Sequence, residues 1–188
     1  MSKTITDIAA AIAASIDTRE IDADRLLEFF DQLKFTRVPV REEEGKDDEK
    51  TWRVVMINLV TRQEPLALEV WEEVTIGRRV GAPQVDVDLS SHNGLELGVS
   101  RVHASLRPTQ EALLLYDMGS TNGTYSNNVK ATADNPLTIK ENDILAFGAL
   151  KFLVKVVRYP GMKEGEEKRK KKGTMSPQVP TTPTDQKE

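Results

Sequence analysis

The sequence of 188 residues predicts an all-β protein whose main domain, residues 51–158, is an antiparallel β-sandwich. Two observations carry this prediction. From residue 51 onward, short runs rich in Val, Leu and Ile follow one another at brief spacing, and turn residues separate them. No helical period intervenes between these runs. A short N-terminal helical hairpin and a disordered C-terminal tail are expected to flank the sandwich.

Residues 1–40 are predicted to form an amphipathic helical segment. Apolar residues recur there at three- and four-residue steps in two runs, Ile5, Ile8, Ile12 and Ile16, and then Leu26, Phe29, Phe30 and Leu33. Asp22 can cap the second helix. Two short helices cannot hold a fold alone. Residues 4–35 therefore either pack on their own domain or remain partly ordered, or they serve self-association or partner docking.

A charged linker and a polar tail are predicted on either side of the sandwich. Residues 41–50, REEEGKDDEK, contain no apolar residue and are expected to be solvated. Residues 159–188 contain almost no hydrophobic residues and are expected to be disordered. Their basic cluster, residues 168–172, is expected to be solvated, with contact to nucleic acid or to an acidic surface as the alternative. If a kinase modified Thr181, Thr182 or Thr184, the domain would be able to bind its own tail, whereas a plain tail is the simpler interpretation.

The predicted strands read, in order, TWRVVMINLV, PLALEV, VTIG, VDVDLS, VHASL, ALLLYD, LTI, DILAF and LKFLVKVV. VDVDL alternates strictly and KFLVKVV nearly does, which is typical of a strand with one buried face. A strand-like TYSNN follows the polar stretch GSTNGT.

Composition excludes several classes of protein and site. Cysteine is absent, which removes disulfides, thiol nucleophiles and cysteine-bound zinc and favours a reducing compartment. No run of about 18 apolar residues and no signal-peptide pattern occurs, so the protein is predicted to be cytoplasmic, without a membrane partner. The net charge of −4 argues against general nucleic-acid binding. Residues 51–158 carry 11 basic and 12 acidic side chains, so any anion site there has to be built locally.

An enzyme is not expected. The chain has two histidines, and Ser100 beside His103 lacks both a third group and a nucleophile elbow. GSTNGT lacks the lysine and the following helix of a P-loop. No group of residues stands out as a metal-ligand cluster. The sequence thus predicts no catalytic residue, no metal and no cofactor.

Three turn segments lie between predicted strands: TIGRR (75–79), GVSRVH (98–103) and GSTNGTYSN (119–127). Alternate loops of a sandwich gather at one end, where binding residues tend to lie. If these loops share an end, they bring together two guanidinium groups, two hydroxyls and an amide, from Arg78, Arg101, Ser100, Thr121 and Asn122. Guanidinium groups bind phosphate bidentately and hydroxyls complete its shell. The pattern indicates a phosphate site.

The order Gly-Arg, then SxxH, then STNGTxxN, then DILAFG resembles the forkhead-associated (FHA) domain over roughly residues 53–157. The connection SSHNGLELG (90–98) is similar to bacterial versions of the family. The resemblance implies an eleven-stranded β-sandwich whose end loops bind phosphothreonine in a partner protein and discriminate against phosphoserine.

The resemblance also implies a role for each matched residue of the phosphopeptide site. Arg78 would contact the phosphopeptide, and Ser100 and Thr121 would bind the phosphate. Asn122 would hold the peptide backbone near the phosphothreonine, and Arg101 would be a second cation.

Four further residues match positions that shape the loops. Asn127 would hold the loop or the peptide, and His103 would brace the binding loops through hydrogen bonds. Gly77 and Gly123 would supply backbone freedom that a Cβ forbids. Asn128 stands where the family often has Gly, and Asn tolerates the left-handed conformation better than most residues.

The sequence therefore predicts a phosphothreonine-dependent protein-binding module that acts as a signalling adaptor. Its expected partner is a threonine-phosphorylated protein, such as a Ser/Thr kinase or a kinase substrate. The alternative is a structural protein that assembles through residues 4–35 without phosphate dependence. Nucleic-acid binding by the lysine-rich tail, which would depend steeply on salt, is a third interpretation and ranks last.

Overall fold

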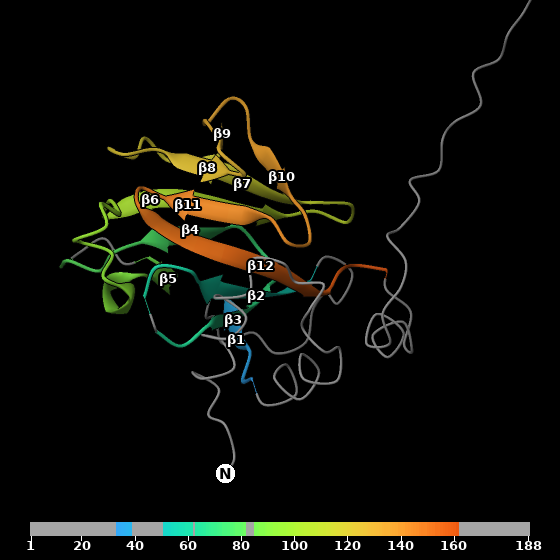
Figure 1. The fold of residues 1–188 in the computed structure, drawn as a ribbon. Helices are drawn as coiled ribbons and strands as arrows, with labels where there is room; N and C mark the ends of the chain where they lie inside the picture. The colour runs from blue at the N-terminus through green and yellow to red at the C-terminus, as the bar shows by residue number, and fades with distance from the viewer. Residues whose placement is uncertain (1–32, 39–50, 62, 82–84, 162–188) are drawn as a thin grey trace, which may run out of the picture.

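A computed structural model of the chain describes residues 33–38, 51–61, 63–81 and 85–161. These residues form a two-layered β-sandwich, and the helix among them is the single 3₁₀ turn Ser90–His92 (Figure 1). The strands are β1 (Thr36–Val38), β2 (Trp52–Asn58), β3 (Leu66–Val70), β4 (Val74–Gly77), β5 (Val87–Asp88), β6 (Val102–Pro108), β7 (Leu113–Asp117), β8 (Thr124–Ser126), β9 (Val129–Lys130), β10 (Leu137–Ile139), β11 (Ile144–Phe147) and β12 (Leu150–Arg158).

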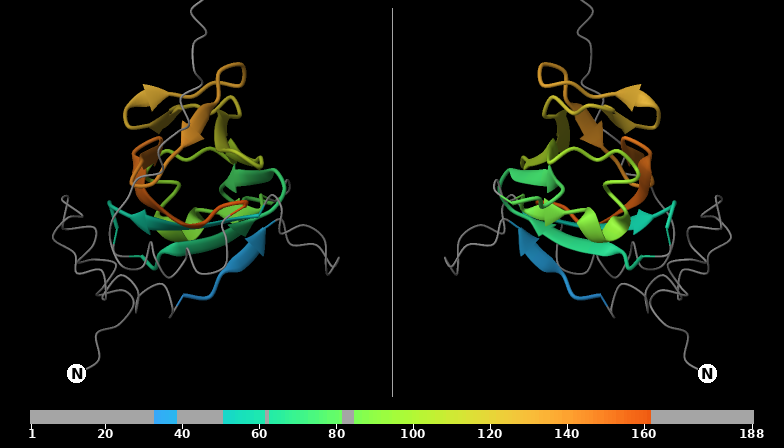
Figure 2. Two further views of the ribbon diagram at one scale, coloured as in Figure 1. Left: turned by 90° about the vertical axis from the view of Figure 1, so that its right-hand side faces the viewer. Right: turned by 90° about the vertical axis from the view of Figure 1, so that its left-hand side faces the viewer.

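The strands divide into a seven-stranded and a five-stranded sheet. The seven-stranded sheet has the order β1-β3-β2-β12-β11-β8-β9, and the five-stranded sheet has the order β10-β7-β6-β4-β5. Neighbouring strands are antiparallel except for the edge pairs β1–β3 and β4–β5, which are parallel. The two side views in Figure 2 show the layers facing each other across the core.

Alternation of side chains along each strand builds the core between the sheets. Val54 and Met56 of β2 and Phe152 of β12 belong to one cluster of buried residues, as does Phe147 of β11. The Phe147 and Phe152 rings pack edge to face with 6.2 Å between their centroids. Burying an apolar side chain of this size stabilises a fold by about 1.5–3 kcal/mol, so this interior is what holds the loops in place.

The predicted all-β sandwich of two sheets is confirmed. The predicted helical hairpin, the linker 41–50 and the tail beyond residue 161 lie outside the described residues. Within the predicted helical segment 1–40, Thr36–Val38 forms a strand instead, paired with β3 from Thr36↔Leu68 to Val38↔Val70. A three-residue strand is too short to show a period, which is why the sequence did not reveal it. No helix in the described part of the chain is long and apolar enough to cross a membrane.

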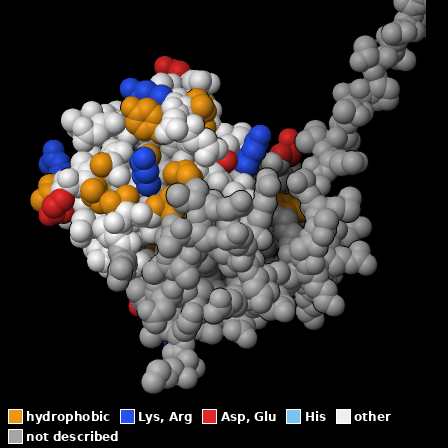
Figure 3. Space-filling view, viewed as in Figure 1, with side chains coloured by type: hydrophobic (Ala, Val, Ile, Leu, Met, Phe, Trp, Pro, Cys, Tyr) orange, Lys and Arg blue, Asp and Glu red, His pale blue; other side chains and the backbone are white. Residues whose placement is uncertain are grey.

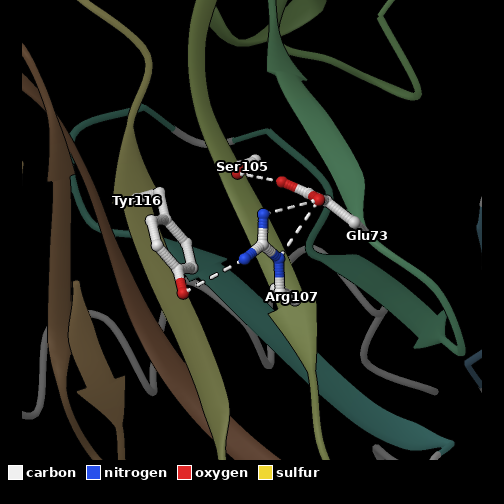
Figure 4. A network of polar contacts seen from close by, with 4 residues as sticks. All are labelled: Glu73, Ser105, Arg107 and Tyr116. Carbon is white, nitrogen blue, oxygen red and sulfur yellow. Dashed lines mark hydrogen bonds and ion pairs between the residues drawn. The ribbon is translucent and has the colours of Figure 1, made fainter. Parts of the chain in front are cut away.

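The solvent-facing side of the five-stranded sheet carries a polar network, drawn in Figure 4. Arg107 donates from Nε and Nη2 to Glu73 Oε2 at 3.1 and 2.9 Å, and its guanidinium carbon lies 4.6 Å from the centroid of the Tyr116 ring. Ser105 donates its hydroxyl to the other oxygen of Glu73 at 2.9 Å. Glu73, just before β4, thus connects the side chains of Ser105 and Arg107 on β6.

Candidate anion-binding site

Three loops meet beside the ends of β4, β6 and β7. The backbone N–H of Arg78, just after β4, donates to the carbonyl of Arg101, just before β6, at 3.1 Å. The N–H of Thr121, in the connection from β7 to β8, donates to Ser100 Oγ at 3.1 Å. The three segments that the sequence singled out therefore do come together.

These loops surround an open pocket of about 460 Å³. It is lined by Arg78, Ser100, Arg101, Val102, Gly119 and Thr121. Four of the six predicted phosphopeptide-binding residues lie in this lining. Asn122 directly follows the lining residue Thr121 in the chain, and Asn127 lies in the turn between β8 and β9.

The described lining of the pocket contains two basic side chains and no acidic one. Among the described residues, no carboxylate pairs with the guanidinium of Arg78 or of Arg101. Arg78 donates from Nε to the carbonyl of Val99, which fixes the plane of its guanidinium and leaves the terminal nitrogens for a ligand. On the face shown in Figure 3, basic and acidic side chains interleave with hydrophobic ones, as expected for a domain of nearly balanced charge. The positive site is local.

The side chains of Ser100 and Asn122 each make one hydrogen bond to another described residue, and each keeps one polar function for a ligand. Ser100 Oγ accepts from the Thr121 N–H, so its own O–H is able to donate to an anion. Asn122 is exposed and donates from Nδ2 to the Gly98 carbonyl at 2.8 Å, which leaves its Oδ1 as an acceptor. Gly98 has a φ of +78°, and a Cβ there would lie 2.3 Å from Asn122 Nδ2, so Gly98 is required for this contact.

His103 connects two of the loops from beneath. It is fully buried, and its Nδ1 accepts from the Ser100 N–H at 2.9 Å, while its Nε2 lies 3.1 Å from the Gly123 carbonyl. An acceptor at Nδ1 and a carbonyl at Nε2 require the neutral ring with its proton on Nε2. Burial lowers the pKa of His103, which favours the same neutral form. His103 is not among the residues that line the pocket.

Comparison with known families agrees with this geometry. The family model for the FHA domain matches residues 74–148, the stretch from β4 through β11 that contains the three loops. The chain contains an FHA domain. Protein FraH of Nostoc sp. is 37% identical to this chain over 75 residues. That stretch is 40% of this chain but 26% of FraH, so the chain matches about a quarter of its relative.

Solved FHA domains are similar to this chain in structure. The N-terminal FHA domain of Rad53p from S. cerevisiae, solved with a phosphothreonine peptide, is 20% identical, with a TM-score of 0.46 over 55% of this chain and 93% of that one. The FHA domain of an Arabidopsis thaliana hypothetical protein is 18% identical, with a TM-score of 0.48 over 66% of this chain and 100% of that one.

Asp117, at the end of β7, organises the Thr121 loop of the FHA domain and was not identified from the sequence. Its carboxylate accepts from the N–H groups of Gly119 and Ser120, both at 3.0 Å, and from the hydroxyls of Ser120 and Thr124. Burial alone would raise the pKa of Asp117, but these hydrogen bonds stabilise the carboxylate and hold the pKa below its ordinary value. The signal was available, because an Asp two residues before Gly-Ser is typical of a side-chain-to-backbone turn.

The two glycines that the sequence singled out are required for different reasons. Gly123 has a φ of +82°, which agrees with the predicted need for backbone freedom. Gly77 does not have a positive φ. A Cβ on Gly77 would lie 2.1 Å from the Arg101 carbonyl, so the requirement there is close approach of two backbones.

Asn127 lies in the β8–β9 turn of the FHA domain and not in the pocket. Its Nδ2 donates to Asp143 Oδ1 at 2.7 Å, and its Oδ1 accepts from the Ile144 N–H at 2.9 Å. Asn127 and Asn128 have φ values of 49° and 68°, the two left-handed residues of a tight hairpin turn. Of the two roles predicted for Asn127, these contacts correspond to holding the loop.

Proposed function

We propose that this FHA domain is a signalling adaptor that binds phosphothreonine in a partner protein through the pocket of Arg78, Ser100, Arg101 and Thr121. One observation carries the proposal: two guanidinium groups, unpaired with any described carboxylate, share a pocket with the Ser100 hydroxyl. A phosphate carries about −1.5 to −2 charges near neutral pH, so it is the peptide modification that this site fits.

Each polar group of the site has a role in this proposal. The guanidinium groups bind the phosphate oxygens, and the Ser100 and Thr121 hydroxyls donate to the same phosphate. Asn122 Oδ1 accepts from a backbone N–H of the peptide beside the phosphothreonine. Val102, which also lines the pocket, provides an apolar contact for the threonine methyl group that serine lacks.

The partner in this proposal is a threonine-phosphorylated protein, either a Ser/Thr kinase or a substrate of one. No catalytic step, metal or cofactor is assigned to the site. The domain contributes recognition alone, and its rigid sandwich holds the loops in the conformation that binds, which lowers the entropic cost of binding.

A pair of adjacent arginines provides the test. Arg78 lines the pocket, whereas Arg79 is exposed, lies outside the lining, and directs Nη2 to the Val85 carbonyl at 3.5 Å. Wild-type, Arg78→Ala and Arg79→Ala proteins would be used to capture partners from lysates with and without phosphatase treatment. Capture should depend on phosphate and on Arg78 and not on Arg79.

The expected size of the effect follows from charge pairing. Truncating one partner of a buried charge pair costs about 2–5 kcal/mol, or roughly 30-fold or more in affinity. Arg78→Ala should therefore weaken binding of a captured phosphopeptide by at least that factor, with its unfolding transition still cooperative. Equal capture by Arg78→Ala and Arg79→Ala, or capture that survives phosphatase, would mean that this pocket is not the phosphopeptide site.

A further inference from the structure

The two outer faces of the sandwich differ in chemistry. The outer face of the five-stranded sheet carries the exposed polar network of Figure 4. The outer face of the seven-stranded sheet has an apolar centre that charged side chains border. We call it the outer sheet face and define it by five side chains that alternate with core-facing ones, Val55, Ile57, Ala67, Ala146 and Leu153.

Strand pairing makes the outer sheet face continuous. Val55 is in register with Ala67 of β3, and Ile57 is in register with Leu153 of β12. The surface therefore extends over β3, β2 and β12, with Ala146 on the adjoining β11.

This face is covered, although it lies outside the core. Val55 is 0% exposed and Ile57 is 1% exposed, yet neither belongs to the core cluster between the sheets. Every strand in the described residues belongs to one of the two sheets, so none of them crosses this face. Because the side chains are buried within a single chain, the group that covers them is part of the same chain.

Composition selects one segment for this role. Residues 39–40, a proline and a valine, are too few to cover the face, residues 41–50 contain no apolar residue, and residues 162–188 contain almost none. Residues 82–84 lie between β4 and β5, in the opposite sheet. Residues 4–35 carry two runs of apolar residues at helical spacing, Ile5, Ile8, Ile12 and Ile16, and Leu26, Phe29, Phe30 and Leu33.

The described end of this segment already contacts the same face. The Arg53 guanidinium carbon lies 5.8 Å from the centroid of the Phe35 ring, within the range of a cation–π contact. Arg53 is on the outer side of β2, where it pairs with Glu69 of β3 at 2.9 Å. The chain then continues into β1 beside β3, so residues up to 35 are tethered at the edge of the outer sheet face.

Charge agrees with the same assignment. Residues 4–35 carry seven acidic and three basic side chains. On the side of β12 that carries Leu153, Lys151 is exposed, whereas the buried Lys155 already pairs with Glu141. Acidic residues flanking an apolar stripe would thus meet Lys151 beside an apolar face.

We propose that residues 4–35 dock intramolecularly, through their apolar stripes, on the outer sheet face of Val55, Ile57, Ala67, Ala146 and Leu153. This role is independent of phosphopeptide binding, because the face is on the seven-stranded sheet whereas Arg78 and Arg101 flank strands of the five-stranded sheet. Of the two purposes that the sequence leaves open for residues 4–35, this proposal selects packing on their own domain over self-association.

Paramagnetic relaxation in the full-length chain tests this directly, because the sequence contains no cysteine and one engineered thiol takes the nitroxide. Lys151→Cys places the label on the outer sheet face, and Thr138→Cys places it on β10 of the other sheet, both at exposed positions. The label at 151 should broaden the Ile and Leu methyl signals of residues 4–35, and the label at 138 should not. Equal broadening from both positions, or none from 151, would overturn the proposal.

A second sample and a matched pair of substitutions separate the remaining explanations. In a mixture of isotope-labelled chains and spin-labelled chains, no broadening is expected; broadening there would identify a second copy as the occupant and overturn the proposal. Ile12→Asp, on the apolar stripe, should remove the broadening from position 151, whereas Ala14→Asp, on the opposite helix face, should keep it. Identical behaviour of the two variants would also contradict docking through the stripe.

Discussion

Replacing His103 with phenylalanine isolates the two hydrogen bonds that connect the binding loops. The substitution keeps an aromatic ring against Phe147, whose ring centroid lies 5.8 Å from that of His103 in an edge-to-face arrangement. It removes the acceptor for the Ser100 N–H and the donor to the Gly123 carbonyl. Phenylalanine is larger than histidine, but His92→Phe carries the same increase in size, so the difference between these two variants reports the lost hydrogen bonding.

The magnitude follows from what each group retains. The Ser100 N–H loses its partner, and leaving a buried donor unsatisfied costs about 1–3 kcal/mol. The Gly123 carbonyl still accepts from the Gly148 N–H at 3.1 Å, so its loss is that of one ordinary hydrogen bond, about 0.5–1.5 kcal/mol. The free energy of unfolding of His103→Phe is therefore expected to fall by about 2–4 kcal/mol.

Urea unfolding followed by tryptophan fluorescence measures this loss, and titration with a phosphopeptide measures the effect on binding. His92→Phe is the matched control, because His92 is also buried and packs edge to face on Phe152. The one side-chain hydrogen bond of His92 among the described residues is with Asn58 Nδ2 at 3.3 Å, outside the binding loops. That variant leaves the buried Asn58 Nδ2 without this partner, so it should lose about 1–3 kcal/mol and still bind phosphopeptide normally.

The two variants must differ for the reasoning to hold. His103→Phe should weaken phosphopeptide binding under conditions where it remains folded, because the positions of Ser100 and Gly123 depend on the ring. If His103→Phe were as stable as the wild type, or if it bound phosphopeptide as tightly, the bridging role of His103 would be refuted.

Two further predictions concern the far turn and the pH dependence of stability. Asn127→Gly keeps the left-handed turn but removes the side-chain contacts to Asp143 and to the Ile144 N–H. Urea unfolding should therefore show a loss of about 1–2 kcal/mol, while the affinity for phosphopeptide stays within about twofold. A large loss of affinity without a loss of stability would instead place Asn127 at the peptide. Burial lowers the pKa values of both His92 and His103, so the unfolded chain binds more protons than the folded one below about pH 6.5. The free energy of unfolding should therefore be level above about pH 7 and fall as the pH drops below about 6.5. A free energy that stays constant between about pH 7 and pH 5 would contradict neutral, buried histidines.

Much of the fold was visible in the sequence because β-sandwich strands carry a period of two and end at turns. The runs WRVVMIN and KFLVKVV became β2 and β12, the central pair of the seven-stranded sheet. The strand Thr36–Val38 was missed because it is three residues long and pairs with β3, which is distant in the sequence. Local pattern cannot report a pairing that depends on where another strand lies.

The pocket was also visible in the sequence, but its supports were not. Arg78, Ser100, Arg101 and Thr121 stand in motifs whose spacing indicates a shared end of the sandwich, and the structure brings them together. The motifs say nothing of the carbonyl that fixes the Arg78 guanidinium, because that contact is with backbone. The roles of Gly77 and Asp117 likewise depend on which loop lies against which, a property of the tertiary fold.

The sequence also showed the apolar stripes of residues 4–35 but left their purpose open. Self-association and packing on the same domain have the same requirement, an apolar helix face, so no period in the sequence distinguishes them. The distinguishing observation is the buried outer sheet face, which only the arrangement of β3, β2, β12 and β11 reveals.

The central claim, recognition of phosphothreonine, is tested most directly by isothermal titration of the full-length protein with three degenerate peptide pools. The pools are identical except for a central phosphothreonine, a central threonine or a central phosphoserine, so no knowledge of the partner is needed. The phosphothreonine pool should bind wild type and Arg79→Ala but not Arg78→Ala. The phosphoserine pool should bind wild type more weakly than the phosphothreonine pool does, and the threonine pool should show no heat of binding. Equal binding of the phosphothreonine and threonine pools would contradict the account.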